Sequence, residues 1–120
     1  MASMWANLLV LEQNINNQIS ELQQAAGITP QPSSYQGFKQ PSIYEYFLIM
    51  QWDIMAAINQ LNSAAGIAPV VSFAPSNGVG LLEWEYFNTV NTNIQNAIQV
   101  LDAHYGISYT STLFDSPSAN

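Results

Sequence analysis

A repeated unit, a helix followed by a stop, is the feature that most constrains this chain. Ala-Gly-Ile occurs at 26–28 and 65–67, and Tyr-Gly-Ile at 105–107, each time at the end of an apolar, helix-like stretch. The glycines lie 39 and 40 residues apart. A fixed period of this size indicates one structural unit that is used several times. The sequence therefore predicts three equivalent helices around one core.

Placing the three glycines in register aligns the apolar positions of the three stretches without gaps. These positions recur every three or four residues, which is the spacing of one face of an α-helix. The five registered sets are Leu8, Phe47 and Phe87; Leu11, Met50 and Val90; Ile15, Ile54 and Ile94; Ile19, Ile58 and Ile98; Leu22, Leu61 and Leu101.

The predicted fold is all-α: a three-helix bundle of tandem repeats, with helices over about 3–26, 42–65 and 81–105. Ser3 is a plausible N-cap, and Ser42 with Glu45 forms a capping box at the second helix. Each glycine stands where a helix commonly ends in a left-handed residue. The proline-containing segments 29–41 and 68–80 cannot be helical, so they are long linkers.

The length of the linkers bears on the direction of the helices. A helix of this size is roughly 35 Å long, and 13 extended residues span roughly 43 Å. Each linker can therefore return the chain to the starting level, which would leave the helices parallel around a pseudo-three-fold axis. Helix bundles with short loops are antiparallel. Linker length favours the parallel form, and the sequence leaves both open.

The segments outside the helices carry further expectations. Tyr35 and Phe38 should pin the first linker to the bundle, and 70–73 of the second should pack along a groove or form a short strand. We divide the chain into a repeat bundle, 1–107, and a C-terminal arm or tail, 108–120. The arm is too polar for the core, so we expect it to dock on a neighbouring molecule.

The composition is poor in charge and rich in amides. Charged residues make up 8%, the only cation besides His is Lys39, and the net charge is −7, whereas there are 12 Asn and 11 Gln. Average proteins contain about 25% charged residues. Amides cost less to bury than charges, which favours a surface covered by other protein; the alternative is a soluble monomer with an amide-rich surface.

The same composition argues against several classes of partner. One lysine cannot neutralise nucleic-acid phosphates or hold an anionic membrane. No apolar run approaches the ~20 residues of a membrane-spanning helix, and the N-terminal residues have no basic region typical of a signal peptide. With no cysteine, disulfides and thiolate metal sites are excluded.

The ionisable residues do not predict an enzyme. Glu45 and Glu85 occupy equivalent helix starts, where negative charge complements the helix dipole. Glu83 and Glu85 are two residues apart and point in different directions on a helix. His104 is the only histidine, so no zinc site with a second histidine can form. We expect no catalytic residue, no metal, no cofactor and no small-molecule substrate.

Aromatic residues supply the candidate partner-binding residues. Most gather near the predicted helix starts, and two lie in the C-terminal arm. Tryptophan and tyrosine dominate the energetics of protein interfaces. The candidates are Trp5, Tyr44, Tyr46, Trp84, Tyr86, Tyr109 and Phe114. A rival interpretation is a small-molecule pocket among Trp5, Trp52 and Trp84.

Residues 85–94, Glu-Tyr-Phe-Asn-Thr-Val-Asn-Thr-Asn-Ile, resemble a helix motif of tail and other virion proteins of bacteriophages. The motif has an acidic residue, an aromatic pair, Asn, a hydrophobe and Asn-Ile, and it has a weaker echo at 45–54. Thr89 and Asn91 depart from the pattern, which usually has a basic and an acidic residue there. The resemblance implies a small structural component of a phage particle.

Three functions follow as hypotheses. The first is a non-enzymatic virion protein of the neck, tail, fibre attachment or capsid decoration, which binds other virion proteins or copies of itself and is located in the virion. The second is an adaptor or regulatory bundle in the host cytoplasm that binds one protein partner. The third is the small-molecule binder.

Overall fold

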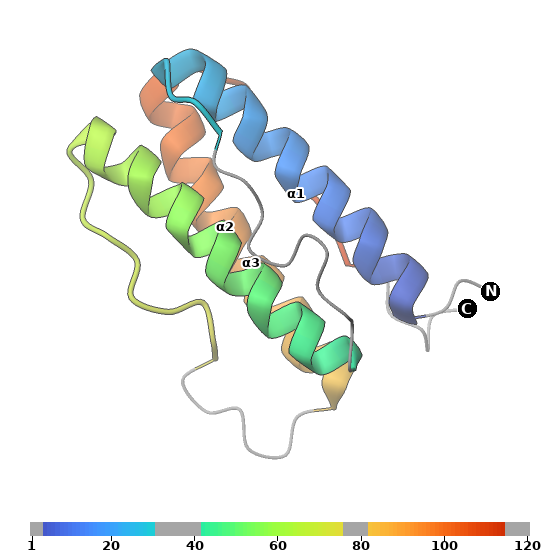
Figure 1. The fold of residues 1–120 in the computed structure, drawn as a ribbon. Helices are drawn as coiled ribbons and strands as arrows, with labels where there is room; N and C mark the ends of the chain where they lie inside the picture. The colour runs from blue at the N-terminus through green and yellow to red at the C-terminus, as the bar shows by residue number, and fades with distance from the viewer. Residues whose placement is uncertain (1–3, 31–41, 76–81, 115–120) are drawn as a thin grey trace.

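Three α-helices form the part of the chain that the computed structural model describes, residues 4–30, 42–75 and 82–114. They are α1 (Met4–Ala26), α2 (Ile43–Ala65) and α3 (Glu83–Tyr105), each 23 residues long. Every helix packs against the other two (Figure 1), and no strand occurs within the described ranges. The predicted all-α class and three-helix bundle are confirmed. The predicted N-cap Ser3 and the linker residues Tyr35 and Phe38 lie outside the described residues.

The three helices run in the same direction. In Figure 1 their starts gather at one end of the bundle and their ends at the other. Ring contacts agree, because Trp5 near the start of α1 meets Tyr46 near the start of α2 with ring centroids 5.5 Å apart. Phe47 of α2 stacks on Phe87 of α3 at 4.0 Å. The chain must therefore travel the length of the bundle between successive helices.

All three helices end in the same way. Gly27, Gly66 and Gly106 have φ of 70°, 73° and 70°, the left-handed conformation that glycine adopts without steric cost. The amide of the following isoleucine donates back to a carbonyl in the last turn, at 3.0 Å in α1 and 2.8 Å in α2 and α3. Each of these isoleucines also packs against the core. This pairing satisfies carbonyls that a helix end otherwise leaves open.

The helix starts differ from one another. At α2, Ser42 Oγ accepts a hydrogen bond from the Glu45 amide at 3.1 Å, which is the serine half of the predicted capping box. Helix α3 begins at Glu83, two residues later than expected, after Leu82 at the N-cap. Leucine has no side-chain oxygen, so Glu85 supplies the cap by accepting from the Leu82 amide at 2.8 Å.

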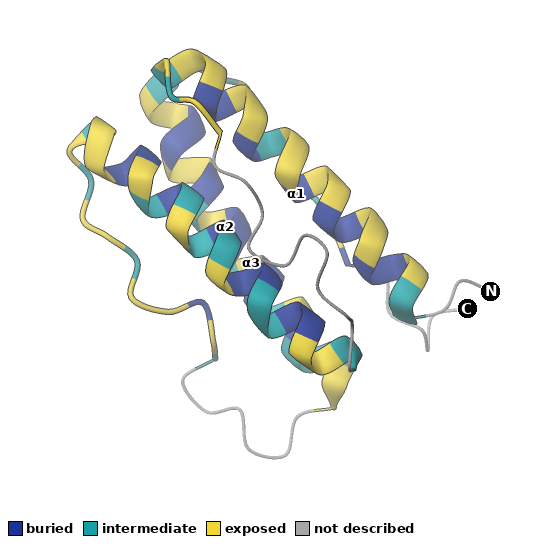
Figure 2. Ribbon diagram, in the orientation of Figure 1, coloured by how far each residue is buried: buried dark blue, intermediate teal, exposed yellow. Residues whose placement is uncertain are grey.

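The core is built from the apolar positions that the glycine register aligns. All fifteen of these side chains are at most 5% exposed. In Figure 2 the buried stretches recur along each of the three helix ribbons. Two polar positions are also buried in every helix. They hold Glu12, Gln51 and Asn91 in one set, and Gln23, Asn62 and Asp102 in the other. The three helices therefore share seven buried positions, five apolar and two polar.

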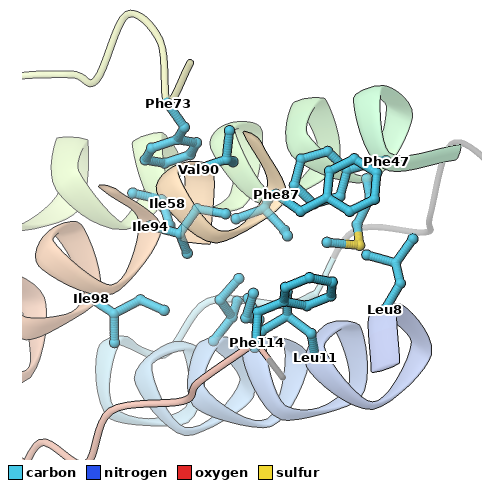
Figure 3. Packing of buried hydrophobic residues seen from close by; sticks show 14 of the residues in the cluster. Leu8, Leu11, Phe47, Ile58, Phe73, Phe87, Val90, Ile94, Ile98 and Phe114 are labelled. Atoms are coloured by element: carbon cyan, nitrogen blue, oxygen red, sulfur yellow. The ribbon is translucent and has the colours of Figure 1, made fainter. Parts of the chain in front are cut away.

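Two aromatic side chains from outside the helices complete the core. Phe73, from the segment that follows α2, is 2% exposed, and Phe114, from the segment that follows α3, is 6% exposed. Figure 3 shows Phe73 near Val90 and Phe114 near Leu11. The expectation that the C-terminal arm is too polar for the core is therefore wrong at Phe114. A single aromatic side chain anchors an otherwise polar segment, which average polarity does not reveal.

We predict that replacing any of the three stop glycines with alanine costs a similar free energy of unfolding, about 1 kcal/mol each. A Cβ would meet nothing within 4 Å at Gly27, Gly66 or Gly106, so only the left-handed backbone opposes it. Chemical denaturation of the three variants measures this cost. Glycine-to-asparagine variants are the control and should lose less, because asparagine tolerates this conformation. A large loss at only one position would contradict the equivalence of the helix ends.

Candidate functional site

The predicted partner-binding residues are mostly part of the chain's own core. Tyr44 is 43% exposed, whereas Tyr46 and Phe114 are buried. Those that are half-buried and pack against the core are Trp5, Trp84, Tyr86 and Tyr109. The aromatic residues therefore leave less free surface at the helix starts than the sequence suggests.

The structure brings four of these residues together at the start of the bundle. Trp5 contacts Tyr46, and Tyr44 contacts Tyr86 with ring centroids 5.8 Å apart. The Tyr46 hydroxyl donates to Glu12 Oε1 at 2.7 Å. Of the remaining three candidates, Trp84 packs against the core from the first turn of α3. The two from the C-terminal arm contact α3: Tyr109 bonds to Gln95, and Phe114 packs on Phe87.

The three tryptophans of the suggested small-molecule pocket are not brought together. Trp52 lies about two turns beyond Tyr44 along α2 and is 63% exposed. No ring contact of the described residues joins it to Trp5 or Trp84. The geometry gives the third hypothesis no support.

Trp52 belongs to an apolar stripe on the outside of α2 that sequence reasoning missed. The stripe consists of Tyr44, Leu48 and Trp52, which are four residues apart and so share one side of the helix. At the positions in register with Trp52, α1 has Gln13 and α3 has Thr92. Trp52 is therefore the stripe residue that α2 alone carries, because α1 has Trp5 and Leu9 in register with Tyr44 and Leu48. The spacing of the stripe could have identified it, but the near-continuous hydrophobicity of α2 concealed it.

The segment after α2 is held in place by asparagine side chains. Asn59 of α2 donates from Nδ2 to the Val70 carbonyl at 2.8 Å, and its Oδ1 accepts from the Val70 amide at 2.7 Å. Asn93 of α3 donates to the Phe73 carbonyl at 2.8 Å. The segment thus lies between α2 and α3, so the groove alternative is the correct one for the described residues 68–75.

The segment after α3 is held in the same way between α3 and α1. Asn91 donates to the Thr112 carbonyl at 2.8 Å, and Gln95 Oε1 accepts from the Thr112 amide at 3.1 Å. Gln18 of α1 donates to the Thr110 carbonyl at 3.0 Å. We call the place between α3 and α1 where this segment lies against Gln18, Asn91 and Gln95 the α3–α1 groove.

We call these side chains amide clamps, defined by Gln18, Asn59, Asn91, Asn93 and Gln95. An extended segment that lies on helices has no neighbouring strand, so its buried backbone N–H and C=O groups need other partners. One carboxamide offers a donor and an acceptor and can bind both groups of a single residue. The amide-rich composition is thus partly explained by the chain's own segments.

Two carboxyl groups are buried at positions where other helices carry amides. Burial raises the pKa of Glu12, and the nearby Asp53 adds to this, while the hydrogen bond from Tyr46 opposes it. Burial, followed by the negative charge of Glu21, raises the pKa of Asp102 to about 6. Asp102 is 4% exposed, and its Oδ1 has no hydrogen-bond partner within the described part of the chain.

These groups do not assemble into a reactive site. Glu12 is engaged by Tyr46, Asp102 lies at the opposite end of the bundle, and His104 is exposed. Within residues 4–30, 42–75 and 82–114, no group of three potential metal ligands occurs. In the same ranges, no helix is long and apolar enough to cross a membrane.

No family model matches this chain, and neither the curated proteins nor the solved structures include a significant match.

We predict that Asn59→Ala releases the segment after α2 while the helices stay intact. The variant loses both hydrogen bonds to Val70, which should lower the free energy of unfolding by about 1–3 kcal/mol. Hydrogen exchange at the Val70 amide should accelerate, and the helical circular dichroism should be unchanged at low temperature. Gln60→Ala, at the exposed neighbouring position, is the matched control. Unchanged protection of Val70 would show that Asn59 does not hold the segment.

We predict that Asp102→Asn stabilises the protein at neutral pH. The carboxyl group ionises near pH 6 in the folded chain and near its ordinary value of 3.8 when unfolded. Between these values the folded state binds more protons, so stability falls as pH rises and stays low above about pH 6. Removing this penalty should add on the order of 2 kcal/mol at pH 7 and flatten the pH dependence between 4 and 6.

The matched control for Asp102 is Glu21→Gln, an exposed change that removes the neighbouring charge and should give a smaller gain of the same sign. Thermal unfolding of the three proteins from pH 4 to 8 separates the effects. A lower melting temperature for Asp102→Asn at pH 7 would show that the ionised carboxylate has a favourable partner.

Proposed function

We propose that this chain is a non-enzymatic structural component of a bacteriophage virion, which acts through contacts with other virion proteins or with copies of itself. Its place would be the neck, the tail, a fibre attachment or the capsid exterior. As part of the proposal, the three helices and their linkers are tandem repeats arranged with pseudo-three-fold symmetry. Nucleic acid, membranes, cofactors and small-molecule substrates have no part in it.

The observation that carries this proposal is the equivalence of three parallel helices. They have equal length, end in the same glycine motif and bury the same seven positions. A bundle of this kind offers three related outer surfaces around its axis. Such surfaces are complementary to a site of three-fold symmetry, which is one of the closed symmetries of homo-oligomeric assemblies. A monomeric adaptor has no need of this equivalence.

Composition and the resemblance at 85–94 give further support. Only 8% of residues are charged, which suits a surface that stays covered in an assembly. Within the motif, Glu85 caps α3, Phe87 and Ile94 are buried in the core, and Asn91 clamps Thr112. The motif residues therefore act structurally, as expected for a building element.

A second candidate, an adaptor or regulatory bundle in the host cytoplasm, rests on the α2 stripe. Trp52 is 63% exposed and has no counterpart on α1 or α3. An exposed tryptophan within an apolar stripe is a typical anchor for a single protein partner. This surface breaks the equivalence of the helices, so the two candidates predict different behaviour for one substitution.

Peptide mass spectrometry of purified particles tests the proposal. Cleavage should not rely on trypsin, because Lys39 is the only lysine or arginine. We expect the protein at a fixed copy number that equals the number of three-fold positions in its part of the particle. Its presence in the lysate together with its absence from particles would refute the virion function. Trp52→Gln, which installs the α1 residue at the same register, should leave the copy number unchanged. Loss of a partner with this variant would instead favour the adaptor.

A further inference from the structure

We propose that Asp102 makes the attachment of residues 107–114 to the α3–α1 groove sensitive to pH. The neutral acid keeps this segment closed on α3, and the carboxylate promotes its local opening. This coupling is a property of the chain itself and does not depend on the proposed function. It follows from the path of the segment, the burial of the Asp102 carboxyl group and the groups that surround it.

The segment after α3 runs along the side of α3 that carries Asp102. It begins at Ile107, whose amide donates to the Asp102 carbonyl at 2.8 Å. It then reaches Gln95 Oε1, which accepts from the Tyr109 hydroxyl at 2.8 Å and from the Thr112 amide at 3.1 Å. Gln95 and Asp102 are about two helical turns apart and share one side of the helix. The segment therefore passes Asp102 on its way to Gln95.

The Asp102 carboxyl group is covered but not paired. The residue is 4% exposed, and its Oδ1 has no hydrogen-bond partner among the residues that the structure describes. An unpaired carboxylate loses far more hydration energy on burial than the neutral acid does. Burial, followed by the negative charge of Glu21, raises the pKa of Asp102 to about 6. The group therefore changes its charge just below neutral pH.

The ionisable groups on the surrounding elements do not offset the cost of this charge. On α1, Glu21 adds a like charge. On the segment, burial followed by the charge of Asp102 raises the pKa of Tyr109. On α3 itself, His104 is two residues away and exposed, and the ionisable side chains of α2 end at Asp53, near the middle of that helix. The carboxylate is thus stabilised mainly by regaining water.

Opening of residues 108–112 is the least costly way to admit water. Helices α1 and α3 each bury five apolar side chains of the core, so moving either helix would disrupt the bundle. Residues 108–112 contribute no fully buried side chain and lie between Ile107 and Phe114, which pack in the core. Local openings of this kind require only part of the global unfolding free energy. Both Ile107 and Phe114 can stay in place while the residues between them open.

The direction of the effect follows from the two states of Asp102. In the closed segment its pKa is about 6, and in an opened, hydrated segment it moves towards the ordinary value of 3.8. Below about pH 4 the group is protonated in both states, so opening is rarest there. Opening becomes more frequent as the pH rises and is constant above about pH 6. Complete rehydration would increase the opening equilibrium constant roughly 100-fold, and partial rehydration less.

The segment after α2 provides a comparison within the same chain. It is attached in a similar way, because Asn59 Oδ1 accepts from the Val70 amide at 2.7 Å. At the position in register with Asp102, however, α2 carries the neutral Asn62. Opening of this segment should therefore be independent of pH.

Amide hydrogen exchange of the full-length chain tests the coupling. Protection factors, which correct for the intrinsic pH dependence of exchange, are compared at pH 4.5 and 7.5 for the Thr112 and Val70 amides. We expect the protection of Thr112 to fall roughly tenfold and that of Val70 to stay constant. In Asp102→Asn, the protection of Thr112 should no longer change with pH. Glu83→Gln, which removes an exposed charge from the first turn of α3, is the matched control and should leave the fall at Thr112 unchanged.

Three results would overturn the proposal. Equal falls at Thr112 and Val70 would mean that pH acts through the stability of the whole bundle. A fall at Thr112 that persists in Asp102→Asn would assign the effect to another group. Constant protection of Thr112 would mean that the bundle accommodates the Asp102 carboxylate without opening the segment.

Discussion

The parallel direction of the three helices is the constraint on which the other features of this structure depend. Helices that run the same way force the chain to return the full length of the bundle between one helix and the next. In the return after α2, the described residues 68–75 lie on helices, where no neighbouring strand offers hydrogen bonds to their backbone. The helix surfaces must supply these bonds, and Asn59 and Asn93 do so; Asn91 and Gln95 do the same for the segment after α3. Amide side chains are therefore a consequence of the topology as well as a property of the surface.

The parallel arrangement also determines which chemistry the two ends of the bundle can carry. The helix dipoles add instead of cancelling, so partial positive charge collects at the starts and partial negative charge at the ends. Glu45, Glu83 and Glu85 lie in first turns, where they complement this field. No lysine or arginine occupies a last turn, and His104 is the only basic residue there. The helix-end face consequently has little of its own to offset its negative potential.

The sequence was sufficient for the periodic part of the fold and insufficient for the segments between the helices. Gly27, Gly66 and Gly106 fixed the helix ends and the core register, because both depend on local spacing. The contacts of Phe73 and Phe114 depend on which groove each segment enters, which spacing does not encode. Part of the predicted partner-binding surface was wrong for the same reason. Tyr46 occupies a position of α2 that could face either solvent or α1, and only tertiary packing buries it against Glu12.

The places where the three helices differ are more informative about function than the places where they agree. A shared core explains the five apolar layers, because each layer needs three side chains of compatible volume. The polar layers vary more: Asn62 and Gln23 are neutral, whereas Asp102 at the same register is a buried carboxyl group that weakens the fold at neutral pH. It lies at the root of segment 107–114, where the Ile107 amide bonds to its carbonyl and its charge raises the pKa of Tyr109, after burial. Asp102 and Glu12 are thus the two positions at which a buried carboxyl group replaces the amide that the other helices carry.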